Sequence, residues 1–309
     1  MRYRWVDAYR GIAVLFMVTL HFFVNIFPIQ PIPLLNYGIR GVISIGDMAL
    51  ALFLFISGVS AYLSISQSKK TDDEAVSDVV KRYSRIFIIG LFLDFILLAL
   101  VHYIWWVLEA ISLAGLIAMF FIRFSDRMKL LTIAVVGLCY SYITSFPLVY
   151  FIASQFPNGG LLGAVPLSGI VLAGYMAGER IMKKKRKSLP FFLGAGLLLI
   201  LAGFVLSYFM TYDRGIGTFP HIVLSSGFCI LLMIPVYWLV ELKHVSSRIL
   251  EEFGKSALLI FVLNYPVLIL ALALHINNSF STEQVALITL ALISLLVIAS
   301  KLYLRFSEP

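Results

Sequence analysis

Charged residues are scarce in this sequence. Only 13% of its 309 residues are Asp, Glu, Lys or Arg, and 61% are hydrophobic. A soluble domain has about 25% charged and roughly 45–50% apolar residues. Because the apolar excess extends along the whole length, the composition excludes a soluble protein with one membrane anchor and indicates a multi-pass membrane protein.

Cysteine is also rare. Cys139 and Cys229 are the only two, and both lie in apolar runs without the spacing of a metal or redox motif. We therefore expect buried structural cysteines and no metal site. The N-terminal MRYRWVDAYRG lacks a small-residue cleavage site before its long apolar run, so we interpret it as the start of a permanent helix and not as a signal peptide.

Apolar runs of about 20 residues, the length that spans a bilayer, recur along the chain. The sequence thus predicts an all-α, polytopic integral membrane helix bundle with about ten transmembrane helices, forming one transmembrane domain over 1–309. The runs cover about residues 8–28, 46–66, 86–103, 105–123, 129–147, 160–179, 190–210, 220–240, 256–275 and 284–303. We interpret the short apolar segment 148–157 as re-entrant or interfacial, and expect an interfacial helix in the loop before the third run.

Basic residues support this count. With both termini cytoplasmic, all but two of the 24 lysines and arginines fall in inner segments, the exceptions being Arg40 and Arg214. A wrong helix count would scramble the alternation downstream of the error. The net charge of +8 therefore reflects topology, and we predict no nucleic-acid partner. The run KKKRK at 183–187 is typical of a topological anchor or of a contact with anionic lipid.

A few ionisable residues lie within the apolar runs, where such groups are expensive and often functional. His21 is eleven positions after Arg10, about 20° past three helical turns, and Asp7 lies on the same face. This stripe places an arginine at the inner surface and a histidine about 16 Å further along the axis. Asn25 continues it by one turn. The alternative is a histidine that only packs through a hydrogen bond across helices.

Other polar residues have two interpretations each. Asp47 lies at the depth of His21 and could orient its imidazole, or it could cap the second helix. Asp94 lies in the middle of the third run, and we expect a structural partner for it. On the outer side, HYIWWVLE at 102–109 includes His102 and Glu109, while TYDRGIGTFPH at 211–221 includes Arg214. Aromatic rings beside an acid suit sugar binding as well as an interfacial belt.

Cationic side chains gather where the third helix leaves the cytoplasm. Arg82 and Arg85 are spaced i, i+3 and follow Lys81. Together with Arg10 they would suit a phosphate clamp, and ordinary positive-inside charge is the alternative.

Several of these motifs resemble one family. DAYRGIAVLFMV in the first run and DMALALFLFISG in the second are similar to the heparan-α-glucosaminide N-acetyltransferase-like family of membrane acyltransferases. The ten residues between Arg10 and His21 also fit the arginine-to-histidine spacing of the wider acyltransferase-3 superfamily. LLGAVPLSGIVLAGYMAGER and FGKSALLIFVLNYPVLI resemble later landmarks of the same family.

The resemblance implies transfer of an acetyl or other acyl group from cytosolic acyl-CoA, the co-substrate, to an amine or hydroxyl of a sugar-like or glycolipid acceptor at the far face. Nucleotide phosphates would bind Arg10, Arg82, Arg85 and Lys81. His21 would be the general base, steadied by Asp47. Asn25 or Asn264 would stabilise the oxyanion, and His102, Glu109 and Arg214 would face the acceptor. The resemblance leaves both direct transfer and an acyl-histidine open.

Two other classes of function are compatible with the sequence. A small-solute or proton-coupled transporter could use His21, Asp47 and Asp94 as a polar path, although paired broken helices are missing from the pattern. A non-catalytic relative could retain the scaffold and bind lipid. We expect a multi-pass protein of the plasma membrane that has membrane lipids as partners and could form a homodimer.

Overall fold

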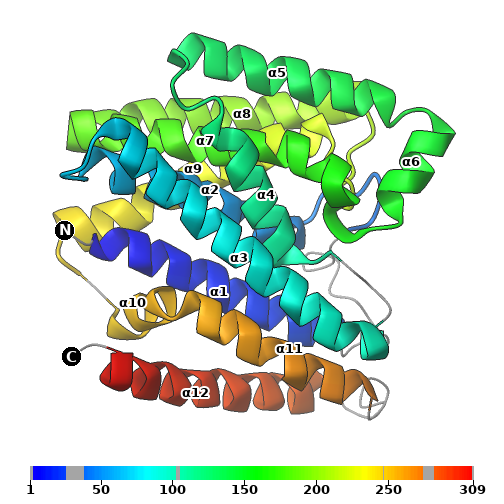
Figure 1. Cartoon of the computed structure of the whole chain (residues 1–309), viewed down its shortest axis with the longest axis vertical. Helices are drawn as coiled ribbons and strands as arrows, with labels where there is room; N and C mark the ends of the chain where they lie inside the picture. Colours follow the sequence, from blue (N-terminus) through cyan, green and yellow to red (C-terminus); the bar gives the residue numbers. More distant parts are fainter. Residues whose placement is uncertain (1–2, 26–37, 102–104, 246, 274–281, 308–309) are drawn as a thin grey trace. The chain divides into compact units, whose positions relative to one another are not determined.

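The computed structural model describes residues 3–25, 38–101, 105–245, 247–273 and 282–307, and every regular element in these ranges is helical. Figure 1 shows the elements along the chain. They are α1 (Arg4–Asn25), η1 (Ile45–Asp47), α2 (Met48–Ser66), α3 (Asp72–Val101), α4 (Val107–Met119), α5 (Asp126–Ile143), α6 (Pro147–Ser154), η2 (Pro157–Gly159), α7 (Gly160–Lys184), η3 (Lys185–Ser188), α8 (Leu189–Phe209), α9 (Phe219–Tyr237), η4 (Trp238–Leu242), α10 (Arg248–Lys255), α11 (Ala257–Ala273) and α12 (Thr282–Ser307).

Each of the ten apolar runs contains a helix over the residues that the structure describes. α3 begins before its run because the helix expected in the preceding loop continues into it without a break. The short apolar segment after the fifth run forms α6, which is bent by 106° from α5. Pro147 at the first position of α6 explains the break, since proline is tolerated in a first turn but cannot continue a preceding helix.

Four helical stretches are long and apolar enough to cross a membrane, or five if α5 and α6 form one bent span. One of the four, residues 157–209, contains both α7 and α8, between which Lys185 has a φ of 47°. α1, α3 and α11 run up to segments outside the described residues. The structure is therefore that of an all-α integral membrane protein, and this criterion yields fewer spans than the ten expected.

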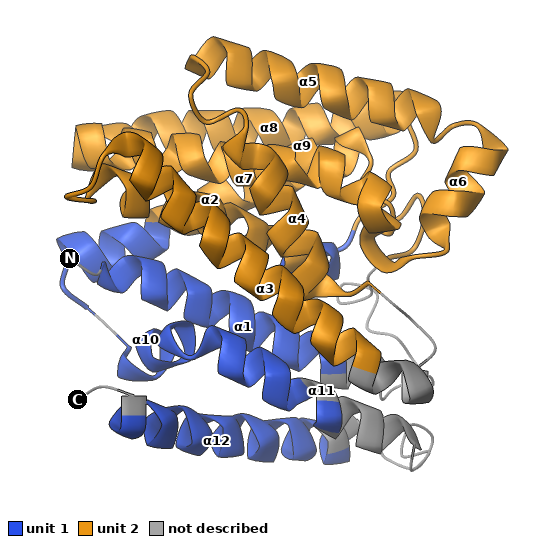
Figure 2. Cartoon of the chain, viewed as in Figure 1, with its two compact units in different colours: residues 1–37, 44–49, 235–309 blue, residues 38–43, 50–234 orange. Residues whose placement is uncertain are grey.

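The chain forms two compact units, coloured in Figure 2. Unit 1 comprises Met1–Tyr37, Ser44–Ala49 and Pro235–Pro309, and unit 2 comprises Gly38–Ile43 and Leu50–Ile234. The single domain expected over residues 1–309 stays a prediction.

In unit 2, α7 packs against α4, α5 and α6. α2 and α7 approach backbone to backbone, because a Cβ added at Gly58 would collide with the Val171 carbonyl and one at Gly174 with the Phe55 carbonyl. The small residues of FLFISGVSAYLS thus serve the close helix packing that their spacing favours.

Polar contacts of unit 2 gather in two groups. In one, Arg123 pairs with Asp73, and Lys129 lies 3.8 Å from Glu179. In the other, Gly41 N donates to Tyr212 O at 2.7 Å and Phe219 N donates to Ser141 Oγ at 2.8 Å. The Arg123–Asp73 pair joins segments predicted to be cytoplasmic, and the Gly41–Tyr212 bond joins segments predicted to lie outside.

In unit 1, α1 contacts α10, α11 and α12. Trp5 of α1 is fully buried, with its ring edge-on to Tyr237 at a centroid distance of 5.5 Å. This packing positions one face of α1 against α10 and α11, the face that carries the polar stripe.

Candidate functional site

Asp7 and Arg10 form the first part of the site on α1. Apolar residues fill most of this helix, and Asp7 in its first turn complements the helix dipole. Arg10 Nη1 lies 3.0 Å from Asp7 Oδ1, with the aspartate side chain nearly buried and the arginine side chain 27% exposed. The aspartate thus holds the guanidinium in place while leaving part of it accessible.

α10 closes the other side of Arg10. Its Gly254 carbonyl lies 3.5 Å from Arg10 Nη1. A Cβ added at Gly254 would collide with the Asp7 carbonyl, and one at Gly11 would collide with the Leu250 carbonyl. Only glycine permits this approach, so the two backbones form a fixed frame around the guanidinium.

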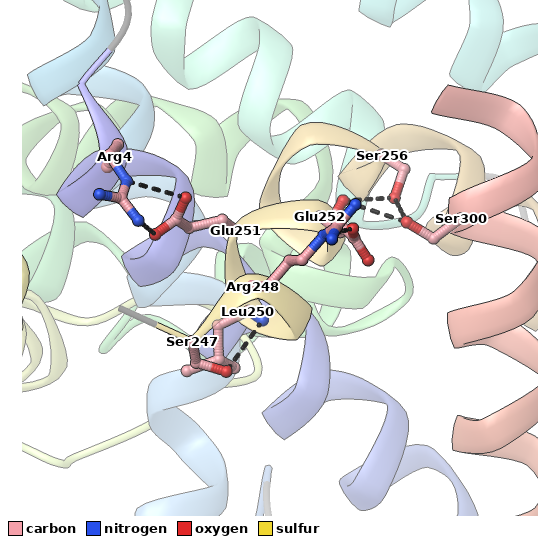
Figure 3. A network of polar contacts seen from close by, with 8 residues as sticks. All are labelled: Arg4, Ser247, Arg248, Leu250, Glu251, Glu252, Ser256 and Ser300. Atoms are coloured by element: carbon pink, nitrogen blue, oxygen red, sulfur yellow. Dashed lines mark hydrogen bonds and ion pairs between the residues drawn. The ribbon is translucent and has the colours of Figure 1, made fainter. Parts of the chain in front are cut away.

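A polar network holds α10 in this position (Figure 3). Arg4 makes two contacts of 3.1 Å with the Glu251 carboxylate, which joins α10 to α1. Ser256 Oγ lies 2.6 Å from Ser300 Oγ of α12, and both hydroxyls donate to the Glu252 carbonyl. The short helix is therefore tied to two neighbouring helices of unit 1.

His21 meets Asn264 further along α1. Asn264 of α11 is fully buried, and its Nδ2 lies 2.7 Å from Nδ1 of the half-buried His21. The two residues are 243 positions apart in the sequence. The structure thus brings together two of the predicted site residues.

The amide partner controls the tautomer of His21. With Asn264 Nδ2 toward the ring, Nδ1 accepts a hydrogen bond and Nε2 carries the proton. With the carboxamide turned over, Oδ1 accepts from Nδ1–H and the lone pair of Nε2 can take a proton. In the first arrangement Asn264 Oδ1 is buried without a hydrogen-bond partner among the described residues. Once the carboxamide is turned over, Nδ2 lies at that buried position and can donate a hydrogen bond there.

Asp47 is also in unit 1 and is 1% exposed. Its Oδ2 accepts a hydrogen bond from Ser44 N at 3.1 Å. This contact matches the capping role considered for Asp47, since the carboxylate satisfies a backbone donor ahead of α2. Its predicted action on His21 stays a prediction.

The predicted cationic cluster lies on α3 of unit 2. Arg82 is partly buried, with its Cζ 5.7 Å from the centroid of the Tyr83 ring, while Lys81 and Arg85 are exposed. Tyr83 is buried and its hydroxyl lies 3.3 Å from Ser57 Oγ, so the ring beside the Arg82 guanidinium is held in place. Arg10 belongs to unit 1, and the four-residue clamp stays a prediction.

Asp94 and Glu109 both bind backbone in the turn before α4. Asp94 Oδ2 accepts from Trp105 N at 2.5 Å, which supplies the structural partner expected for Asp94. Glu109 is fully buried and accepts from Trp106 N at 2.9 Å, so it caps α4. His102 and the side chain of Asn25 lie outside the described residues.

Arg214 lies in the loop between α8 and α9 that also contributes to a polar cavity of about 330 Å³. Arg40 Cζ lies 4.3 Å above the Tyr150 ring in this cavity, and Tyr150 Oη donates to Asp213 Oδ2 at 3.2 Å. Burial raises the pKa of Asp213, and hydrogen bonds from Tyr150 and the Gly215 backbone oppose the shift. Arg40 and Asp213 were not among the predicted site residues.

α10 was also missed as a part of the site, because the sequence predicts no helix between the apolar runs 220–240 and 256–275. A local signal existed in Ser247, which precedes the helix and accepts from Leu250 N through its side chain. The contact of Gly254 with Arg10 joins residues 244 positions apart and has no local signal.

The fold and these contacts define a multi-pass helical membrane protein with a polar site along its first helix. Residues 2–213 match the family described as heparan-alpha-glucosaminide N-acetyltransferase, catalytic, and the chain belongs to this family. No curated protein matches the chain. The matched region contains His21 and Arg10, whereas Asn264 lies beyond it.

Proposed function

We propose that this protein is a membrane acyltransferase that moves an acetyl or other acyl group from cytosolic acyl-CoA to an amine or hydroxyl of a sugar-like or glycolipid acceptor at the outer face. Membership of an acetyltransferase family supports the reaction class. The observation that carries the assignment to this chain is the contact of 2.7 Å between His21 and Asn264.

In the proposed reaction His21 is the general base. Nε2 takes the proton from the acceptor N–H or O–H as the acceptor atom attacks the thioester carbonyl. The tetrahedral intermediate then collapses, the carbon–sulfur bond breaks, and the imidazolium returns the proton to the departing CoA thiolate. The products are the acylated acceptor and CoA, so protons and bonds balance without a further reactant.

Asn264 has two tasks in this scheme. Its Oδ1 accepts from Nδ1–H of His21, which keeps the lone pair on Nε2 and stabilises the imidazolium. Its Nδ2 then becomes a buried donor available to the oxyanion, and one such donor is worth about 10²–10³ in rate. Asn25 is the alternative donor, and Asp47 would act on His21 through water or a second contact.

The donor nucleotide would bind at the cytoplasmic end of the stripe. Arg10, held by Asp7 and the Gly254 carbonyl, offers a guanidinium of fixed position. A fixed, forked guanidinium suits phosphate better than a mobile ammonium. Lys81, Arg82 and Arg85 belong to unit 2, and their contact with the nucleotide phosphates stays a prediction of the sequence.

The acceptor would use the outer loops. The cavity of Arg40, Tyr150 and Asp213 presents an aromatic ring, a carboxylate and several hydroxyls, which are the groups that bind sugars. Arg214 lies in the same loop as Asp213, and His102 and Glu109 would complete the surface.

The proposal includes ten spans with both termini in the cytoplasm of a plasma-membrane protein. This topology is supported by contacts within each unit, which join predicted inner segments to inner segments and predicted outer segments to outer segments. The Asp73–Arg123 and Arg4–Glu251 pairs join predicted inner segments, and the Gly41–Tyr212 bond joins predicted outer segments. Membrane lipids are expected partners, and a homodimer is compatible with the scheme.

The transporter interpretation relied on Asp47 and Asp94 as parts of a polar path. Each of these carboxylates accepts a hydrogen bond from a nearby backbone N–H. Because this is the behaviour of capping and structural residues, no contact in the described part of the chain favours transport over acyl transfer.

The test is an acyl-transfer assay with purified protein in lipid nanodiscs, using acetyl-CoA as the donor and a p-nitrophenyl α-glucosaminide as the acceptor probe. We expect CoA release that depends on the acceptor and disappears in His21→Ala. The exposed His244 provides the matched control, His244→Ala, which should keep its activity. Solute uptake into proteoliposomes without CoA, together with an unaffected His21→Ala, would overturn the proposal.

A further inference from the structure

Unit 2 contains a second cavity, of about 450 Å³, walled by α5, α7, α8 and α9. This volume falls within the roughly 300–1,000 Å³ of small-molecule sites. Its inner wall is apolar and buried, as Phe192 and Ile222 show with exposures of 2% and 1%. Leu130 and Phe191 also line it but are 57% and 48% exposed, so the cavity reaches the surface between apolar side chains.

The end of α7 adds cations to this apolar cavity. Arg180, Lys183 and Lys184 line it together with two acids, Asp126 and Glu179. Both acids have basic partners, since Lys183 lies 2.6 Å from Glu179 and the buried Lys129 lies within 4 Å of both carboxylates. Arg180 and Lys184 have no acidic partner in the described part of the chain, which leaves a positive charge at the cavity.

The surroundings of Arg180 favour the binding of an anion. Its Cζ stands 3.4 Å from the centroid of the Phe191 ring, which fixes the guanidinium against the apolar wall. Its Nε is buried and has no hydrogen-bond partner among the described residues. A buried donor without a partner is unfavourable, and an anionic acceptor would remove that cost.

We propose that this cavity binds one anionic phospholipid, with an acyl chain between α5, α7, α8 and α9 and the phosphate at Arg180 and Lys184. A buried apolar wall, together with two cations that lack an acidic partner among the described residues, matches an amphiphile with an anionic head group. A neutral lipid would leave the two cations uncompensated, and a soluble phosphate would leave the apolar wall empty. None of the residues that line this cavity is assigned to acyl transfer, so the proposal does not depend on that assignment.

The experiment is native mass spectrometry of the full chain in detergent, titrated with palmitoyl-oleoyl phosphatidylglycerol or with phosphatidylcholine of the same acyl chains. We expect one phosphatidylglycerol to bind per chain, more tightly than phosphatidylcholine. The double variant Arg180→Gln, Lys184→Gln should weaken it about tenfold, as expected for the loss of charge-assisted hydrogen bonds. The double variant Lys185→Gln, Arg186→Gln removes the same charge from exposed residues that do not line the cavity and should change binding less than twofold.

A second pair of variants tests the apolar part. Ala195→Leu fills the cavity wall on α8 and should weaken phosphatidylglycerol binding, whereas Gly194→Leu points a side chain into open space and should not. Unchanged elution and unfolding temperature identify folded variants, and Arg180→Lys keeps the charge if Arg180→Gln fails to fold.

Four results would overturn the proposal. Equal weakening by both charge pairs would show general attraction to a basic surface, and equal affinity for the two lipids would exclude selection of a net negative head group. Displacement of the lipid by acetyl-CoA would make the cavity a donor site, and displacement by glycerol 3-phosphate alone would exclude a role for the acyl chain.

Discussion

Two histidines of this protein have opposite surroundings. His21 of unit 1 is half-buried and meets Asn264 from a distant helix, whereas His221 of unit 2 is fully buried. Nδ1 of His221 lies 3.2 Å from both the Tyr212 and Ser225 hydroxyls, its neighbours in sequence. A histidine that meets an amide from a distant helix and whose ring is only half-buried can exchange a proton with a substrate. A ring enclosed by local hydroxyls contributes to packing.

The strongest test of this comparison removes each imidazole. His21→Ala should reduce acyl transfer by about 10²–10⁴-fold, the usual contribution of a general base. His221→Ala should instead lower the unfolding temperature and leave the turnover of the folded fraction nearly unchanged. Turnover per folded molecule, measured with acetyl-CoA and the glucosaminide probe, separates the two effects. An equal loss of turnover in both variants would abolish the distinction.

A variant of Asn264 tests whether the partner of His21 takes part in the chemical step. Asn264→Ala removes both the tautomer partner and the proposed oxyanion donor, so kcat should fall by about 10²–10³-fold while the KM for acetyl-CoA stays within a factor of two or three. Ser294→Ala on α12 is the control, since among the described residues the Ser294 hydroxyl bonds only to Leu290 O of its own helix. A change confined to KM would show that Asn264 positions substrate and does not take part in the chemical step.

Arg10 is expected to act on binding. Arg10→Gln should raise the KM for acetyl-CoA about tenfold, because one charge-assisted contact to phosphate is lost. Arg4→Gln removes an arginine from the same helix end that is engaged with Glu251 and should leave KM unchanged. If both variants raise KM equally, the general charge of this surface attracts the nucleotide and Arg10 has no specific role.

Asp213 offers a test in unit 2 through pH. Burial raises the pKa of Asp213 in the folded state, so the folded protein disfavours its ionised form. Its contribution to stability is full below the ordinary carboxyl pKa of about 3.9 and is lost as the pH rises through the raised pKa. Asp213→Asn should therefore reduce the fall in unfolding temperature that occurs as the pH rises above about 4. The same slope in both proteins would exclude this carboxyl as its source.

The smallest expected effect concerns the Arg4–Glu251 pair. The Arg4 side chain is 55% exposed, and exposed ion pairs usually couple by about 0.2–1 kcal/mol. A double-mutant cycle with Arg4→Gln and Glu251→Gln, followed by unfolding temperature, should give a coupling in this range. A markedly larger value would show that the pair, and not the glycine contacts of α10, anchors that helix.

The positions of the helices were predictable because the apolar runs and their breaks are local properties. The common face of Asp7, Arg10 and His21 follows from the period of the helix alone. The bend between α5 and α6 was also indicated by the short apolar segment 148–157, which was interpreted as re-entrant or interfacial. The role of α10 was not predictable in the same way, since its eight residues carry many charges and resemble a loop.

By itself, the sequence determined the membrane class, the helices and the polar stripe on the first of them, since composition and periodicity act within a single segment. Only the tertiary structure decided that Asn264 is the partner of His21, that Gly254 lies against Arg10, and that Glu109 is used as a cap. It also decided that the cations at the end of α7 line an apolar cavity. The physical reason is that helix periodicity selects a face, while the helix that meets this face depends on packing between residues hundreds of positions apart.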